Sequence, residues 1–168
     1  MALAVIMVLY VSIGLLAAAG AVLMARRLFS PKAEQIFFAL FLGPIAAFYL
    51  AFTAYFGVPG AWRLETSGVI AFSLLGLAGT RWASMISVGY ALHGVWDILH
   101  ELHAHSGVGL FGAERPTEIP LAYGAFCLAY DWLVAGYAYR RRKAWSASGS
   151  TRPAVGGSGV RYPSRSSD

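Results

Sequence analysis

The stretch MALAVIMVLYVSIGLLAAAGAVLMARR (Met1–Arg27) decides the class of this protein, because no charged side chain occurs in it before Arg26. A helix that crosses the hydrocarbon core of a bilayer needs about 20 mostly apolar residues. The stretch lacks the basic start of a signal peptide, and its apolar run is too long for one. We therefore expect residues 2–25 to form a first membrane span that is retained in the protein.

The rest of the chain has a similar character. Hydrophobic residues make up 58% of the sequence and charged residues 12%, whereas soluble domains are about 45–50% apolar and about 25% charged. Including the first stretch, the segments that qualify or nearly qualify as spans are residues 2–25, 36–56, 62–79, 82–102 and 119–139. We expect one all-α transmembrane domain over residues 1–145, followed by a disordered tail over residues 146–168 that is rich in Ser, Gly, Arg and Pro.

The positive charges favour this count of five spans. The clusters that would then share one side of the membrane are Arg26–Arg27, Lys32, Arg81 and Arg140–Lys143. The opposite side would receive only Arg63 and Arg115. Cytoplasmic loops carry an excess of Lys and Arg, so the sequence predicts a multi-pass protein of the cell membrane with its N-terminus outside and its C-terminus in the cytoplasm. The net charge of +5 follows this topology and does not indicate a nucleic-acid partner.

A polar stretch, HGVWDILHELHAH (His93–His105), interrupts the fourth apolar segment and contains all four histidines of the chain. In a helix, each residue is rotated by about 100° from the one before. His93, Asp97 and His100 therefore share one helix face, and Glu101 lies directly beside it. His103 and His105 are expected in a solvated loop at the outer end.

Two other spans would carry acidic side chains to the same level. With a rise of about 1.5 Å per residue, His93 lies about 17 Å from the inner end of its span and Asp131 lies about 18 Å from the outer end of the fifth. Glu65 begins the third span at its outer end, level with His100. Three helices are thus expected to contribute ionisable groups to the outer half of the membrane.

Charged side chains inside a bilayer cost at least about 2.5–3.5 kcal/mol each on insertion scales, so these groups should face one another. Imidazoles together with carboxylates are suitable ligands for Zn, Fe or Mn. The predicted ligands of a divalent transition metal are His93, Asp97, His100 and Asp131. Glu65 and Glu101 are the candidates for an additional ligand or a general base. We expect a metal-dependent enzyme that acts on a lipidic or small apolar substrate.

Two other functions remain open from the sequence. The same groups suit a carrier of protons, other ions or a small solute, although no inverted repeat is evident. They also suit a structural membrane protein in which hydrogen-bonded Asp–His pairs hold helices together.

The motif His93-x-x-Trp96-Asp97-x-x-His100 resembles a family of small, uncharacterised multi-pass membrane proteins of bacteria, the domain-of-unknown-function family 6010. The segment from Cys127 to Asp131 is similar to a second family element, Cys-x-x-x-Asp. The similarity covers roughly residues 45–139. Glu101 stands where the family has a second histidine. The resemblance implies a shared site in a membrane protein, and it implies no particular reaction.

Overall fold

The computed structural model describes residues 1–106, 109–112 and 114–148. Over these residues the chain forms five α-helices and one short 3₁₀ helix, with no strand. The elements are α1 (Ala2–Leu28), α2 (Pro31–Phe56), η1 (Pro59–Ala61), α3 (Trp62–Arg81), α4 (Ser84–Ser106) and α5 (Tyr123–Ser148). The prediction of an all-α chain with five helices is confirmed. Most of the predicted disordered tail, residues 149–168, lies outside the described residues.

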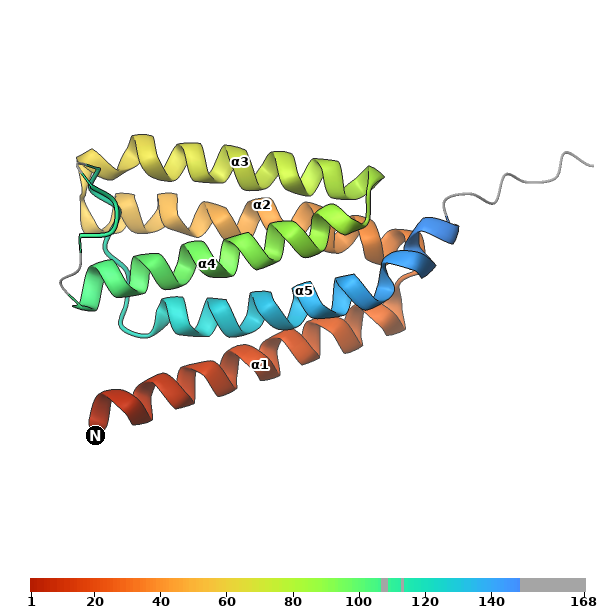
Figure 1. Ribbon diagram of the computed structural model, residues 1–168, viewed down its shortest axis with the longest axis horizontal. Helices are drawn as coiled ribbons and strands as arrows, with labels where there is room; N and C mark the ends of the chain where they lie inside the picture. The colour runs from red at the N-terminus through yellow and green to blue at the C-terminus, as the bar shows by residue number, and fades with distance from the viewer. Residues whose placement is uncertain (107–108, 113, 149–168) are drawn as a thin grey trace, which may run out of the picture.

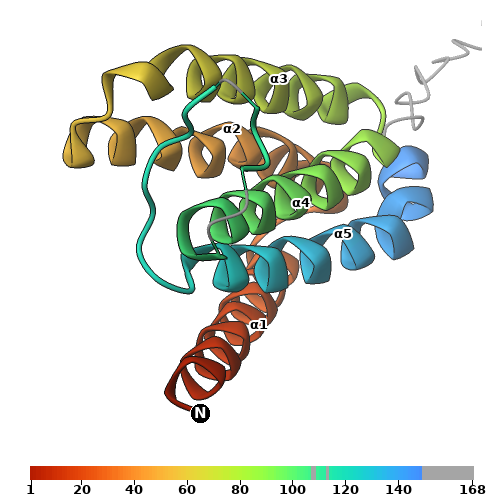
Figure 2. The ribbon, with the colours of Figure 1, turned by 60° about the vertical axis from the view of Figure 1, so that its left-hand side comes forward.

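The helices run alternately up and down along the long axis of the molecule (Figure 1). Helix α5 packs mainly against α4 and α1, while α2 packs mainly against α3. Helix α1 is the outermost member of the bundle, and its N-terminal half diverges from the other helices (Figure 2). Contact between α2 and α5 is slight. A cavity lies between these two helices, and the candidate site residues His93 and Asp131 form part of its wall.

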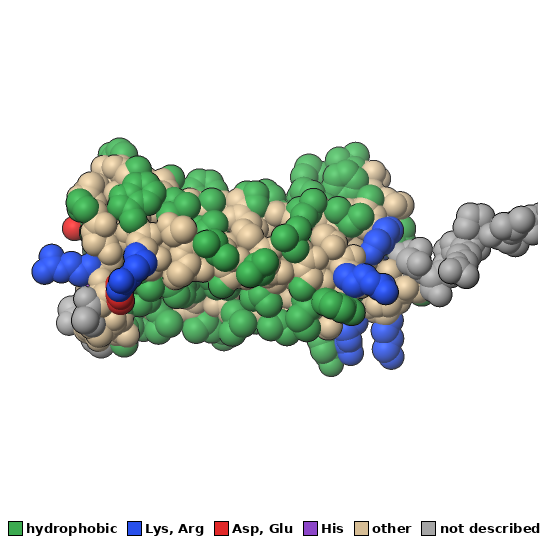
Figure 3. Space-filling view, turned by 90° about the horizontal axis from the view of Figure 1, so that it is seen from above, with side chains coloured by type: hydrophobic (Ala, Val, Ile, Leu, Met, Phe, Trp, Pro, Cys, Tyr) green, Lys and Arg blue, Asp and Glu red, His purple; other side chains and the backbone are tan. Residues whose placement is uncertain are grey.

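Apolar side chains cover much of the outer surface. On the face drawn in Figure 3, the Lys, Arg, Asp and Glu side chains gather at the two ends of the molecule, and the middle is green with apolar groups. By length and composition, α1 and α2 are apolar enough to cross a membrane. This observation agrees with the first two predicted spans.

Helix α2 begins earlier than the predicted span because its start is capped. The Ser30 hydroxyl accepts a hydrogen bond from the Ala33 N–H at 3.4 Å, and Pro31 takes the first helical position. Both are common features of helix N-termini. The helix ends at Gly57, which adopts a left-handed conformation with φ of 63°, as is usual after a helix C-terminus.

Helix α5 is shifted towards the C-terminus relative to the predicted span, residues 119–139. It begins at Tyr123, directly after Ala122 with a φ of 64°. It continues through Ser148, so residues 146–148 are helical and not part of a disordered tail. Trp145 explains the extension, because its side chain is fully buried and its indole N–H donates to Glu34 at 2.8 Å.

Two glycines let α4 and α5 approach closely. A Cβ atom added at Gly124 would lie 2.4 Å from the carbonyl oxygen of Asp97, and one added at Gly94 would lie 2.8 Å from the Trp132 side chain. Neither distance leaves room for a methyl group. The absence of side chains at these positions allows Asp97 and Asp131 to face each other across the interface.

Candidate metal centre

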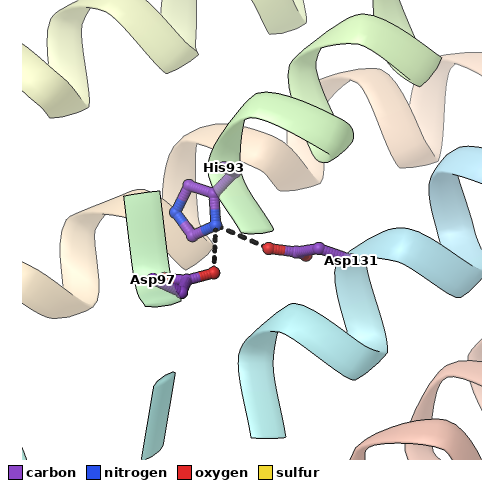
Figure 4. Close-up of side chains that lie close together, drawn as sticks. All are labelled: His93, Asp97 and Asp131. Atoms are coloured by element: carbon purple, nitrogen blue, oxygen red, sulfur yellow. Dashed lines mark hydrogen bonds and ion pairs between the residues drawn. The ribbon is translucent and has the colours of Figure 1, made fainter. Parts of the chain in front are cut away.

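Three buried side chains from two helices meet at one point. His93 and Asp97 lie one turn apart on α4, and Asp131 faces them from α5 (Figure 4). The His93 Nδ1 atom lies 2.7 Å from Asp131 Oδ2 and 3.0 Å from Asp97 Oδ2. One candidate ligand atom from each residue falls within 4.8 Å of the others. All three residues are at most 1% exposed, so the group is isolated from solvent.

Among the described residues, this group combines two carboxyl groups with a single imidazole. Asp97 Oδ1 accepts a hydrogen bond from the Tyr49 hydroxyl at 2.5 Å, and Asp97 Oδ2 is in polar contact with His93 Nδ1 at 3.0 Å. Within the same described part of the chain, neither Asp97 nor Asp131 forms an ion pair with a Lys or Arg. Two carboxylates share a single imidazole in an apolar interior, and this is costly unless a proton or another cation is added.

The geometry suits a metal ion. The 2.7 Å separation of His93 Nδ1 from Asp131 Oδ2 is that of a hydrogen bond. Together with the 3.0 Å separation from Asp97 Oδ2, it is also close to the spacing of about 3.0 Å between neighbouring ligands of an octahedral ion bound at about 2.1 Å. One imidazole nitrogen and two carboxylate oxygens form a donor set for Zn, Fe or Mn. Three protein ligands also leave coordination positions for water or a substrate.

A cavity of about 240 Å³ lies beside two of the three residues, His93 and Asp131, between α2 and α5. Its walls are formed by Phe41, Ile45, Phe48, His93, Tyr123, Phe126, Cys127, Tyr130 and Asp131. Most of these side chains are aromatic or aliphatic. His93 and Asp131 therefore belong both to the candidate metal centre and to the wall of an apolar cavity.

His100, predicted as a fourth metal ligand, does not belong to this three-residue group. Its Nε2 atom lies 3.1 Å from Glu65 Oε1, and its Nδ1 atom lies 3.0 Å from the carbonyl oxygen of Trp96. Glu65 Oε1 also accepts the backbone N–H of Thr117 at 2.9 Å. His100 and Glu65 thus form a second buried imidazole–carboxylate pair, and Glu65 Oε2 has no hydrogen-bond partner among the described residues.

Glu101, predicted as a ligand or base, holds the start of α5. Its two oxygens accept the backbone N–H groups of Ala122 at 2.8 Å and Gly124 at 2.9 Å. His103 and His105 lie in the last turns of α4 and not in a loop, because that helix continues to Ser106. A catalytic role for Glu101 or Glu65 stays a prediction.

Tyr49 is the residue at the site that sequence reasoning missed. Its ring centroid lies 4.5 Å from that of His100 and 6.3 Å from that of His93, and its hydroxyl binds Asp97. It therefore connects the two imidazole–carboxylate pairs. In the sequence it is one of several aromatic residues in an apolar segment, and nothing local marks it as different.

A second buried polar cluster at the opposite end of the bundle was also missed. Glu34, on the first turn of α2, accepts hydrogen bonds from the Tyr137 hydroxyl, from Arg141 at 2.8 Å and from Trp145 at 2.8 Å. The neighbouring Gln35 donates to the carbonyl oxygen of Gly79 at 2.7 Å. These contacts join α2 to the last turns of α5 and to the end of α3.

Of three comparisons with known proteins, the one with protein families gives a match. Neither the curated proteins nor the solved structures include a match to this chain. The model of a family of unknown function, DUF6010, matches residues 5–144, which include the histidine motif and Asp131. The resemblance drawn from that motif is confirmed, and the chain belongs to the DUF6010 family.

Proposed function

We propose that all five helices cross a lipid bilayer, with the N-terminus outside and the C-terminus in the cytoplasm. The positive charges support this topology, because those of Arg26, Arg81 and Arg141 lie at one end of the bundle and only Arg63 and Arg115 lie at the other. Large exposed apolar side chains occur on every helix, for which lipid is the natural surrounding. Helices α3, α4 and α5 carry the buried groups of Glu65, His93 and Asp131, and polar groups of this kind face the interior of membrane bundles.

The protein functions as a metal-dependent membrane enzyme in this proposal. The observation that carries it is the meeting of His93, Asp97 and Asp131 at ligand distances, fully buried and without a balancing Lys or Arg among the described residues. A divalent cation would neutralise the two carboxylates. It would also act as a Lewis acid or activate a bound water molecule, as catalytic metal ions do.

The substrate is lipidic or a small apolar molecule. The cavity beside His93 and Asp131 is lined chiefly by aromatic and aliphatic side chains, and such walls favour apolar ligands with few polar groups. Its position between two helices of a membrane bundle gives access from the lipid phase.

Metal analysis of the detergent-purified protein tests the proposal. We expect about one Zn, Fe or Mn ion per chain, and loss of that ion in the His93→Ala, Asp97→Ala double variant. His105→Ala serves as the matched control, because His105 is exposed on the same helix and should leave the metal content unchanged. A metal content far below one per chain that is equal in the wild type and the double variant would contradict the metal centre.

A proton path is the second candidate function, and one observation favours it. The Glu65–His100 pair and the group around His93 are connected through Tyr49, so titratable groups extend from the outer end of α3 to the middle of the bundle. Proton flux into liposomes tests this function. A flux that disappears in Asp97→Asn would support it, and a flux insensitive to replacement of Asp97 and Asp131 would exclude it.

A purely structural role gives a third result. In that case, the wild type would bind no metal and carry no proton flux, and replacement of the buried residues would only lower thermal stability.

A further inference from the structure

We infer that the cavity between α2 and α5 binds a single hydrocarbon chain of a membrane lipid, so that the substrate carries its reacting group within the chain and not in the headgroup. The inference deepens the proposed function and rests on it. Four features support it: the shape of the cavity, its depth, its opening and its contact with two of the candidate ligands, His93 and Asp131.

The shape follows from the spacing of the lining residues. Phe41, Ile45 and Phe48 occupy positions i, i+4 and i+7 of α2, and Tyr123 and Tyr130 are likewise seven residues apart on α5. Each set forms one stripe along a helix. Seven residues correspond to about 10 Å of helix, so the cavity is a slot between two parallel stripes, directed along the helix axes. Lipid chains in a bilayer have the same direction.

The size of the slot admits a chain and little else. A volume of about 240 Å³ is below the range of about 300–1,000 Å³ of most small-molecule pockets. Spread over about 10 Å, the volume leaves a narrow section along the whole length. A linear chain satisfies both limits, whereas a ring system as large as a sterol or a bulky headgroup does not.

The depth of the slot separates chains from headgroups. Ile45 lies about 21 Å along α2 from Pro31 and about 17 Å from Phe56, at 1.5 Å per residue. In a bilayer with a hydrocarbon core about 30 Å thick, this is near the midplane. Headgroups lie at the surfaces, so the part of a lipid that reaches this level is its chain.

The slot opens towards the outside of the bundle. Phe48, at one edge of the opening, is 53% exposed. None of the lining residues belongs to α1, which packs chiefly against α5. A chain can therefore enter sideways from the membrane between α2 and α5 and reach His93 and Asp131 at the inner wall.

The test uses the full-length protein in lipid nanodiscs with photoactivatable phospholipids. One probe carries a diazirine in the middle of an acyl chain, and the other carries it at the headgroup. We expect the mid-chain probe to label α2 and α5 at the lining residues, with at least ten-fold less labelling there by the headgroup probe. Unlabelled hexadecane, which has no headgroup, should compete with the mid-chain probe.

Two matched variants refine the test. Ile45→Trp fills the slot and should reduce labelling at least ten-fold, whereas Leu74→Trp adds the same side chain on the exposed face of α3, where Leu74 is 60% exposed, and should leave labelling unchanged. Equal labelling by both probes, or failure of hexadecane to compete in the wild type, would overturn the inference even if Ile45→Trp fails to fold.

Metal analysis of the same samples separates this inference from the proposed function. Bound metal without mid-chain labelling of the slot would refute the chain site alone. Mid-chain labelling of the slot in a protein that binds no metal would refute the metal centre, and with it the assignment of the bound chain as a substrate.

Discussion

Two of the buried carboxylate clusters, the one at Glu34 and the one at Asp97 and Asp131, differ in how many partners the described residues supply. Glu34, 1% exposed, receives hydrogen bonds from Tyr137, Arg141 and Trp145, so that its charge is matched by a cation and by two further donors. Asp97 and Asp131 share one imidazole and have no Lys or Arg partner among the described residues.

The difference gives a criterion for choosing between a structural carboxylate and a candidate functional one. Burial alone does not distinguish the clusters, because both are almost fully buried. A carboxylate whose partners are all supplied by the chain holds helices together. A pair of carboxylates with too little positive charge, placed beside a cavity, is instead a candidate for binding a cation from outside the chain.

The largest expected effect is a loss of stability when the cluster around Glu34 is disrupted. Glu34→Ala removes the carboxylate that accepts hydrogen bonds from Arg141 and Trp145, and loss of one partner of a buried ion pair costs about 3–5 kcal/mol. Arg141 is 29% exposed in its side chain, so we expect a value near the lower end, about 3 kcal/mol. Unfolding in detergent measures the loss. The metal content should stay unchanged, and a fall in metal content would show that the two clusters are not independent.

Asp131→Asn should have the reverse effects of Glu34→Ala: metal binding should be lost, and the stability of the metal-free protein should not fall. In the wild type, a metal at 100 times its dissociation constant stabilises the folded state by about 2.7 kcal/mol. The variant lacks one charged ligand, so addition of Zn, Fe or Mn should no longer raise its melting temperature. Without metal it should be at least as stable as the wild type, because one unbalanced buried charge is removed. Equal stabilisation of both proteins by metal would contradict the assignment of Asp131 as a ligand.

The sequence was sufficient for the helices and for part of the site. The apolar segments predicted five helices because their length and composition are local properties. The i, i+4 spacing placed His93 next to Asp97, and counting residues along two spans brought Asp131 to the same level. These steps need only helix geometry.

Contacts that depend on the rotation of one helix against another were not predictable in this way. The sequence placed His100 on the same face as His93, but in the folded chain its ring turns towards Glu65 and the ring of Tyr49. The start of α5 was placed at residue 119 because composition does not reveal the turn at Ala122, whose N–H binds Glu101. The Glu34 cluster joins residues more than 100 positions apart in the sequence.

A smaller effect is expected when the close packing of α4 against α5 is disturbed. This packing positions the incomplete cluster, which consists of His93, Asp97 and Asp131. The methyl group of Gly124→Ala would lie 2.4 Å from the Asp97 carbonyl oxygen and 2.6 Å from the Glu101 Cβ atom. Overpacking of this kind costs about 1–3 kcal/mol and moves helices apart. We expect about 2 kcal/mol of destabilisation together with weaker metal binding. Gly136→Ala on the same helix is the control, because an added Cβ there meets no atom within 4 Å. Similar results for both variants would show that the spacing of α4 and α5 does not govern the site.

The smallest effect concerns Tyr49, which orients Asp97 without belonging to the candidate ligands. Tyr49→Phe keeps the ring against His100 and removes only the hydroxyl that donates to Asp97 Oδ1 at 2.5 Å. Loss of a hydrogen bond to a metal ligand typically weakens metal binding by about 10–100-fold, and we expect the lower end of this range because His93 and Asp131 remain in place. Stability should fall by only about 1 kcal/mol. Metal titration of the purified variant, with Tyr55→Phe on the exposed side of α2 as control, measures the difference. If both variants bind metal with wild-type affinity, the Tyr49 hydroxyl does not position Asp97, and the incomplete cluster consists of His93, Asp97 and Asp131 alone.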